Sequence, residues 1–135
     1  MARVYLDHNA TMPLREEART AMIAAMDVAG NPSSVHAEGR AAKALIERAR
    51  AQVASAFGAD GADVVFVSGA TEAAALACAG RDLCGAEIEH DAVRSWIDPV
   101  LAVDAAGHVA VTEPERTALQ LANSETGVVQ DLPQG

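Results

Sequence analysis

VFVSGATE, residues 65–72, runs from an apolar triplet into a turn of small residues, and the alanine-rich AAALACAG follows at once. A strand, a small-residue turn and a helix in this order favour the α/β class, in which ligands bind beyond the carboxyl ends of the strands. Two interpretations of the turn stay open. It can be a tight turn in which Ser68 or Thr71 caps the helix, or it can seat an anionic group such as a phosphate at the helix N-terminus.

Length and composition restrict the class of protein. The chain has 135 residues, of which half are apolar and 3% are aromatic, so one alanine-rich domain is expected. Its net charge of −9 argues against a nucleic-acid partner, which needs a basic surface. Because the sequence has no apolar run long enough for a bilayer and no secretory signal at its start, we expect a cytoplasmic protein without a membrane partner.

Helical and strand patterns alternate along the chain. We expect a first helix from Pro13, with a buried stripe formed by Leu14, Ala18, Met22 and Met26. Two longer patterns follow, a helix over 39–57 and a strand over 64–67 that is buried on both faces. The remaining expected elements are a helix over 71–79, a short strand over 86–89, a short helix over 91–96, a hairpin from 100 to 111 around the turn 104–107, and a strand over 117–122. This alternation predicts a mainly parallel sheet with flanking helices. Because the pattern stops without a closing helix, we expect an incomplete sheet that is part of something larger.

Two further polar stretches follow expected strands and are candidate ligand sites. His90 can stack on a planar ring or shuttle a proton near neutral pH, or it can be a helix-capping or surface histidine. The segment 123–127 can bind the ring substituents of a ligand, or it can be a polar loop. The two cysteines, Cys78 and Cys84, and the histidines show no metal-ligand spacing.

Taken together, five motifs in order make the chain resemble the cysteine desulfurases. These are pyridoxal-phosphate enzymes of the class V aminotransferase group, with the type I aminotransferase fold. The motifs are YLDHNATMP at 5–13, GNPSSVHAEGR at 30–40, VFVSGATEAAALA at 65–77, EHDAV at 89–93 and NSETGVVQ at 123–130. The five cover nearly the whole chain, which makes them far more specific together than any one of them alone.

The resemblance implies a fold and a set of site residues. The fold would be α/β, an incomplete part of the large domain of the PLP-dependent transferases, with an N-terminal arm and helices over 1–58 and a cofactor-binding α/β portion over 59–135. Ala70 and Thr71 would hold the phosphate of pyridoxal 5'-phosphate. His90 would stack on the pyridine ring and assist proton transfer as the catalytic residue. Ser124 stands where the family has the asparagine that approaches the ring hydroxyl.

The chain also departs from the family pattern. Ser124 is shorter than asparagine, Met12 replaces a threonine, and Ala75 replaces an asparagine. The family's aspartate at the pyridine nitrogen, its Schiff-base lysine and its persulfide cysteine lie further along the chain than this sequence reaches. Lys43, the only lysine, matches no family lysine, so we expect this polypeptide alone not to desulfurate cysteine.

Three hypotheses about function follow from the resemblance. In a complete site the protein would convert L-cysteine to L-alanine and pass sulfur to an acceptor protein for iron–sulfur cluster assembly. This chain would supply the phosphate- and ring-binding half, as a homodimer or paired with a chain that carries the C-terminal half. The alternatives are a non-catalytic, truncated relic that serves as a binding or regulatory module, and another class V aminotransferase chemistry.

Overall fold

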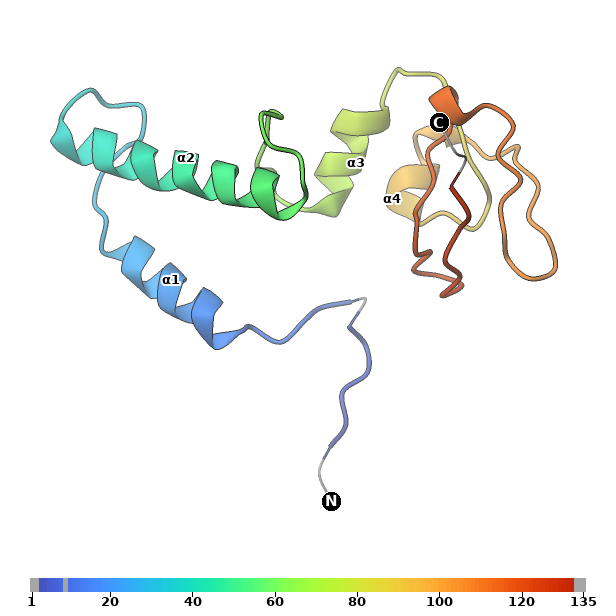
Figure 1. The fold of residues 1–135 in the computed structure, drawn as a ribbon, viewed down its shortest axis with the longest axis horizontal. Helices are drawn as coiled ribbons and strands as arrows, with labels where there is room; N and C mark the ends of the chain where they lie inside the picture. Colours follow the sequence, from blue (N-terminus) through green and yellow to red (C-terminus); the bar gives the residue numbers. More distant parts are fainter. Residues whose placement is uncertain (1–2, 9, 133–135) are drawn as a thin grey trace. The chain divides into compact units, whose positions relative to one another are not determined.

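A computed structural model describes residues 3–8 and 10–132. Its elements, in chain order, are α1 (Glu16–Met26), α2 (Ala37–Ala56), α3 (Ala70–Cys78), β1 (Leu83–Cys84), α4 (Asp91–Arg94), β2 (Ile97–Asp98) and the 3-10 turn η1 (Pro114–Arg116) (Figure 1). The chain forms two compact units, Met1–Phe66 and Val67–Gly135. None of the helices in the described ranges is both long and apolar enough to cross a lipid bilayer.

In the first unit, the loop before α2 folds back onto the first turns of that helix. The Asn31 side chain accepts a hydrogen bond from the Ser33 amide (2.9 Å), and the His36 ring caps α2 by accepting from the Gly39 amide (3.4 Å). A Cβ atom on Gly39 would lie 2.7 Å from the Asn31 carbonyl oxygen, and one on Gly30 would lie 2.6 Å from the Glu38 carbonyl carbon. The motif GNPSSVHAEGR therefore needs glycine at both positions because backbone packs directly on backbone there.

The two helices of the first unit differ in how far they bury their apolar faces. The helix expected over 39–57 is confirmed as α2, which buries Ala42 and Ala54. The buried stripe expected on α1 is wrong, since no residue of α1 is buried and Met22 and Met26 are 50% and 76% exposed. A helix stripe is buried only when another element covers it, and the described residues place none on this face.

The strand expected over 64–67 is also wrong. The segment pairs with no other described strand, and Val65 and Phe66 are 69% and 50% exposed. It is tied to α2 by Arg50, whose guanidinium donates to the Val64 carbonyl and lies 5.0 Å from the centre of the Phe66 ring. Apolar residues alone do not make a strand, because a strand needs a hydrogen-bonded neighbour.

Parallel pairing organises the second unit. β1 pairs with β2 in parallel, with Leu83 opposite Ile97, and Thr117 makes a parallel bridge with Cys84 on the other edge of β1. The helix expected over 71–79 is confirmed as α3, and the hairpin expected around 104–107 is confirmed by the antiparallel bridge of Val103 with Val109. The core consists of Cys84, Ala86, Leu101 and Val109.

Two strand predictions in this unit differ from the structure. Residues 86–89 form a turn, in which the Glu89 amide donates to the Ala86 carbonyl (3.1 Å), and the strand lies just upstream at β1. The strand expected over 117–122 is reduced to single bridges at Thr117 and Ala122. Residues 86–89 bond within their own turn. In 117–122 the Ala118 amide donates to the Cys84 carbonyl and the Leu121 carbonyl accepts from the Gln130 amide, so the partners differ and no continuous ladder forms.

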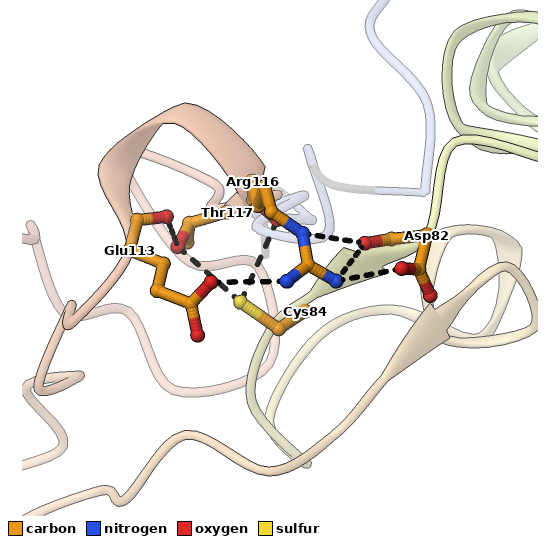
Figure 2. A network of polar contacts seen from close by, with 5 residues as sticks. All are labelled: Asp82, Cys84, Glu113, Arg116 and Thr117. Carbon is orange, nitrogen blue, oxygen red and sulfur yellow. Dashed lines mark hydrogen bonds and ion pairs between the residues drawn. The ribbon is translucent and has the colours of Figure 1, made fainter.

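Arg116 holds the third parallel segment beside β1 (Figure 2). Its guanidinium donates to the Asp82 carbonyl (2.7 Å), the Asp82 carboxylate (2.9 Å) and the Glu113 carboxylate (3.0 Å). Asp82 has a φ of +55°, a left-handed conformation that costs energy in a residue with a Cβ atom. The Cys84 thiol donates to the Arg116 carbonyl (3.5 Å), so β1 and the segment at 116–117 are joined through side chains as well as through backbone.

The close approach at Gly39 can be tested by substitution. We expect Gly39→Ala to lower the free energy of unfolding by about 1–3 kcal/mol, because the new Cβ atom meets backbone atoms that can move only together with the loop. The matched control is Gly69→Ala. Gly69 has an extended φ of 170° and open space where its Cβ atom would lie, so we expect little change. Urea denaturation of both variants measures the difference, and equal stability would contradict the pinned loop.

Candidate functional site

The N-terminus of α3 is open to a ligand. Among the residues that the structure describes, no side chain caps the helix at Gly69. Apart from its two chain neighbours, none of their heavy atoms lies within 4 Å of the place where a Gly69 Cβ would be. Ala70 and Thr71 are both exposed. The first amides of a nine-residue helix, its positive dipole end and the Thr71 hydroxyl are therefore available to an anionic group.

The turn before α3 is closed by Glu72 rather than by a capping hydroxyl. The Glu72 carboxylate accepts hydrogen bonds from the Ser68 amide and the Ser68 hydroxyl, both at 2.7 Å. Both hydrogen bonds lower the pKa of Glu72 below its ordinary value. The bond donated by the Ser68 backbone amide has the larger effect, and the bond donated by the Ser68 hydroxyl has the smaller one. The alternative in which Ser68 or Thr71 caps the helix is not what the structure shows, since Ser68 donates instead to Glu72.

His90 begins α4 and caps it. Its Nδ1 accepts a hydrogen bond from the Ala92 amide (3.0 Å), so the neutral imidazole carries its proton on Nε2. The exposed ring lies in a hollow of about 400 Å³, lined by Glu87, Ile88, Glu89, His90, Asp91, Arg94 and Glu125. Although Ala70 and Thr71 do not line this hollow, α3 and α4 lie against each other (Figure 1), so the helices that carry the two candidate groups adjoin.

Asn123 joins the third candidate stretch to the loop before His90. It is 2% exposed, and its Oδ1 accepts from the Glu125 amide (3.0 Å), the Thr126 amide (2.9 Å) and the Thr126 hydroxyl (3.1 Å). Its Nδ2 donates to the Ile88 carbonyl (3.0 Å). Sequence reasoning placed Asn123 in a candidate stretch but gave it no part in the cofactor site. The structure shows that its carboxamide ties the motif NSETGVVQ to Ile88, the residue just before the motif EHDAV.

Ser124 is held in the same network. Gln120 Oε1 accepts from both the amide (3.1 Å) and the hydroxyl (3.2 Å) of Ser124. The Gln120 amide in turn donates to Glu89 Oε1 (3.3 Å). The structure thus brings Ser124 and the His90 loop together through Gln120 and Glu89, neither of which sequence reasoning singled out.

Glu89 is a buried carboxyl group beside the candidate histidine. It is 3% exposed, and burial raises its pKa, an effect opposed by the hydrogen bond from the Gln120 amide. Its ionised form is therefore destabilised in the folded chain.

We expect Glu89→Gln to stabilise the chain at neutral pH. The folded chain binds the proton of the Glu89 carboxyl group more tightly than the unfolded chain does. The stability that the protonated Glu89 contributes is therefore complete below pH 4.5, and it is lost as the pH rises through the pKa of Glu89 in the folded chain. Glutamine keeps an oxygen acceptor for Gln120 and never ionises. Urea unfolding should give Glu89→Gln a higher free energy of unfolding than the wild type at pH 7 and an equal one at pH 4. The exposed Glu87→Gln should show no such gain, and a gain of equal size there would refute the burial argument.

The Asn123 carboxamide can be tested by two substitutions at one position. Asn123→Ala removes four hydrogen bonds in a buried place, and we expect it to lower the free energy of unfolding by about 2–4 kcal/mol. Asn123→Asp keeps the Oδ1 acceptor but places a carboxylate oxygen against the Ile88 carbonyl in a buried place. We therefore expect it to lower the free energy of unfolding as well, and more at pH 7 than at pH 4. Chemical denaturation gives both values. A loss within about 0.5 kcal/mol for the alanine variant would show that the network is not structural.

Metal and thiol chemistry find little support in the described part of the chain. Within residues 3–8 and 10–132, no group of three or more His, Cys, Asp or Glu side chains could hold a metal ion. Cys78 and Cys84 are free thiols, and both are buried. Cys78, at the end of α3, is 7% exposed and packs as a small buried residue.

Comparisons with known proteins agree with the fold and with the motifs. The sequence pattern of the family described as aminotransferase class-V matches residues 4–93. A cysteine desulfurase from Frankia sp. is 37% identical, over 95% of this chain and 39% of its own length. A selenocysteine lyase from Bos taurus is 32% identical, over 98% of this chain and 41% of its own length.

A solved structure shares the fold. The X-ray structure of a NifS-like protein from Rickettsia africae ESF-5 matches with a TM-score of 0.80 and 31% identity, over 94% of this chain and 42% of that one. The expected α/β class, a partial transferase domain with a small parallel sheet and flanking helices, is confirmed. The chain spans about two-fifths of the length of these relatives.

Proposed function

Because this chain belongs to the class V aminotransferase family, we propose that it supplies the phosphate- and ring-binding half of a pyridoxal 5'-phosphate site in a cysteine desulfurase-like protein. The observation that carries the proposal is the uncapped N-terminus of α3, a helix that lies against α4, which His90 caps. Similarity to cysteine desulfurases over nearly the whole chain supports it.

The residues present fit the phosphate end of the cofactor. Gly69 leaves room for an oxyanion against the backbone, and the amides of Ala70 and Thr71 belong to the unpaired first turn of α3. The Thr71 hydroxyl adds a donor. Glu72 does not compete for this place, because its carboxylate is bound to Ser68.

His90 fits the ring end of the cofactor. Its hydrogen bond with Ala92 leaves Nε2 as the ring atom that holds a proton and can donate it to a ligand. His90 would therefore act as a stacking surface and, through Nε2, as a hydrogen-bond donor. Ser124, tied to Gln120, would lie near the ring substituents.

In the complete protein, the bound cofactor would supply the electron sink for bond breaking in L-cysteine, giving L-alanine and sulfur for an acceptor protein in iron–sulfur cluster assembly. The lysine that attaches the cofactor and the cysteine that takes up sulfur would come from the part of the relatives' length that this chain does not span. A second chain that carries that part would complete the site. We propose a homodimer or a pair with that chain as the assembly, in the cytoplasm. Selenocysteine is the second candidate substrate, because selenocysteine lyases match 98% of this chain.

The proposal is tested by titrating pyridoxal 5'-phosphate into the full chain and following its absorbance and its phosphorus NMR signal. We expect saturable binding that Thr71→Val weakens about five- to tenfold, because one hydroxyl donor to a charged group is lost. Lys43→Arg is the control, since it removes the only amine side chain and should leave this binding unchanged.

Three outcomes would contradict the proposal, in whole or in part. A signal lost in Lys43→Arg but kept in Thr71→Val would mean adventitious reaction at Lys43. No saturable binding, either alone or with a chain carrying the C-terminal half, would favour a non-catalytic relic that acts as a binding or regulatory module. If the mixture binds the cofactor but releases neither sulfide from L-cysteine nor selenide from selenocysteine, another class V chemistry is favoured.

A further inference from the structure

The first unit contains a hollow that the proposed cofactor site does not use. It lies between the loop at 32–35 and one face of α2, and it has a volume of about 550 Å³, within the usual range for small-molecule sites. Its lining residues are Pro32, Ser33, Ser34, Val35, Arg40, Lys43, Ile46, Glu47 and Arg50.

The hollow is held in shape by the contacts that pin the loop to the helix. Gly39 brings the α2 backbone against the loop, and the Ser34 amide donates to the Asn31 carbonyl (2.9 Å). The Arg40 guanidinium donates to the Val35 carbonyl and so joins the two walls. A ligand would not have to order this loop in order to bind, which lowers the entropic cost of binding.

The charge of the hollow is opposite to that of the chain. Arg40, Lys43 and Arg50 face it with one carboxylate, Glu47, although the whole chain carries a net charge of −9. Glu47 is engaged with Arg50, at 3.5 Å from Oε1 to Nε. Arg40 and Arg50 each use one guanidinium nitrogen to donate a hydrogen bond to a backbone carbonyl. Because a guanidinium has five N–H donors, both side chains keep donors for a ligand.

Lys43 is the member of this group without a partner. Among the described residues, its ammonium makes neither a hydrogen bond nor an ion pair, although it stands between two guanidinium groups on the same helix face. Three like charges at one hollow repel each other, and an anion bound among them relieves that repulsion. The hydroxyls of Ser33 and Ser34, on the facing loop, are further donors of the kind that phosphate oxygens accept.

We propose that this hollow binds a compact, multiply charged oxyanion of the phosphate class, at a site distinct from the one proposed for the cofactor. Guanidinium forks match the oxygens of phosphate, and an ammonium adds a mobile point charge. The donors are side chains of a helix face and its facing loop. The proposal therefore does not depend on a helix N-terminus or on the cofactor assignment.

The test uses inorganic diphosphate and the full chain, with affinity measured by calorimetry and by phosphorus NMR. We expect saturable binding that Lys43→Gln weakens about tenfold, the usual effect of losing one charge-assisted hydrogen bond. Arg48→Gln is the matched control: it removes one positive charge from the same helix, and Arg48 does not line the hollow. The affinity of the Arg48→Gln variant for diphosphate should stay within about twofold of that of the wild type.

Three results would overturn the proposal. Equal weakening by Lys43→Gln and Arg48→Gln would mean general attraction to a basic helix. Absence of saturable binding would mean no site. Weakening by Thr71→Val, with Lys43→Gln unaffected, would place diphosphate at α3 instead. Failure of the cofactor titration leaves this result unchanged, because the two sites use different residues, and urea unfolding of each variant shows whether the fold is kept.

Discussion

The carboxamide of Asn123 is the interaction on which the arrangement of the candidate site depends. Its oxygen accepts three hydrogen bonds within its own turn, and its nitrogen donates to Ile88, two residues before His90. The strands of this unit are only two residues long, so backbone ladders cannot hold these loops in place. The buried carboxamide of Asn123 holds the loops together instead. Leaving its polar atoms without hydrogen bonds in the buried interior would cost free energy, so the loops stay where these bonds can form.

The same device recurs elsewhere in the second unit. The Gln130 side chain accepts from the Val109 amide (2.8 Å) and donates to the Gly107 carbonyl (2.9 Å), which fixes the hairpin. Arg116 does the same for Asp82 at the start of β1. Polar side chains that bond to backbone therefore take over a part of the work that longer strands would do, and two of them, Asn123 and Gln130, begin and end the motif NSETGVVQ.

The two ends of the proposed cofactor site are built in different ways. The phosphate end consists of Gly69 and the start of α3, which no side chain of the described residues caps. Its unpaired amides suit a ligand that carries negative charge. The ring end is a fixed place, because one nitrogen of His90 is already bound to Ala92. The two places belong to helices that contact each other, which is why the proposal joins an open helix start on α3 with an oriented imidazole at the start of α4.

The sequence by itself determined the family, the α/β class, the helices expected over 39–57 and 71–79, the hairpin around 104–107, and Ala70, Thr71, His90 and Ser124 as candidates. These follow from local chemistry: helix periodicity, turn residues and motif order. Only the tertiary structure decided that Glu72 closes the turn at Ser68, that Asn123 and Gln120 tie the site loops together, and that the apolar runs on α1 and at 64–67 stay exposed. The physical reason is that burial, strand pairing and side-chain partners all depend on residues far apart in the chain, which no local pattern specifies.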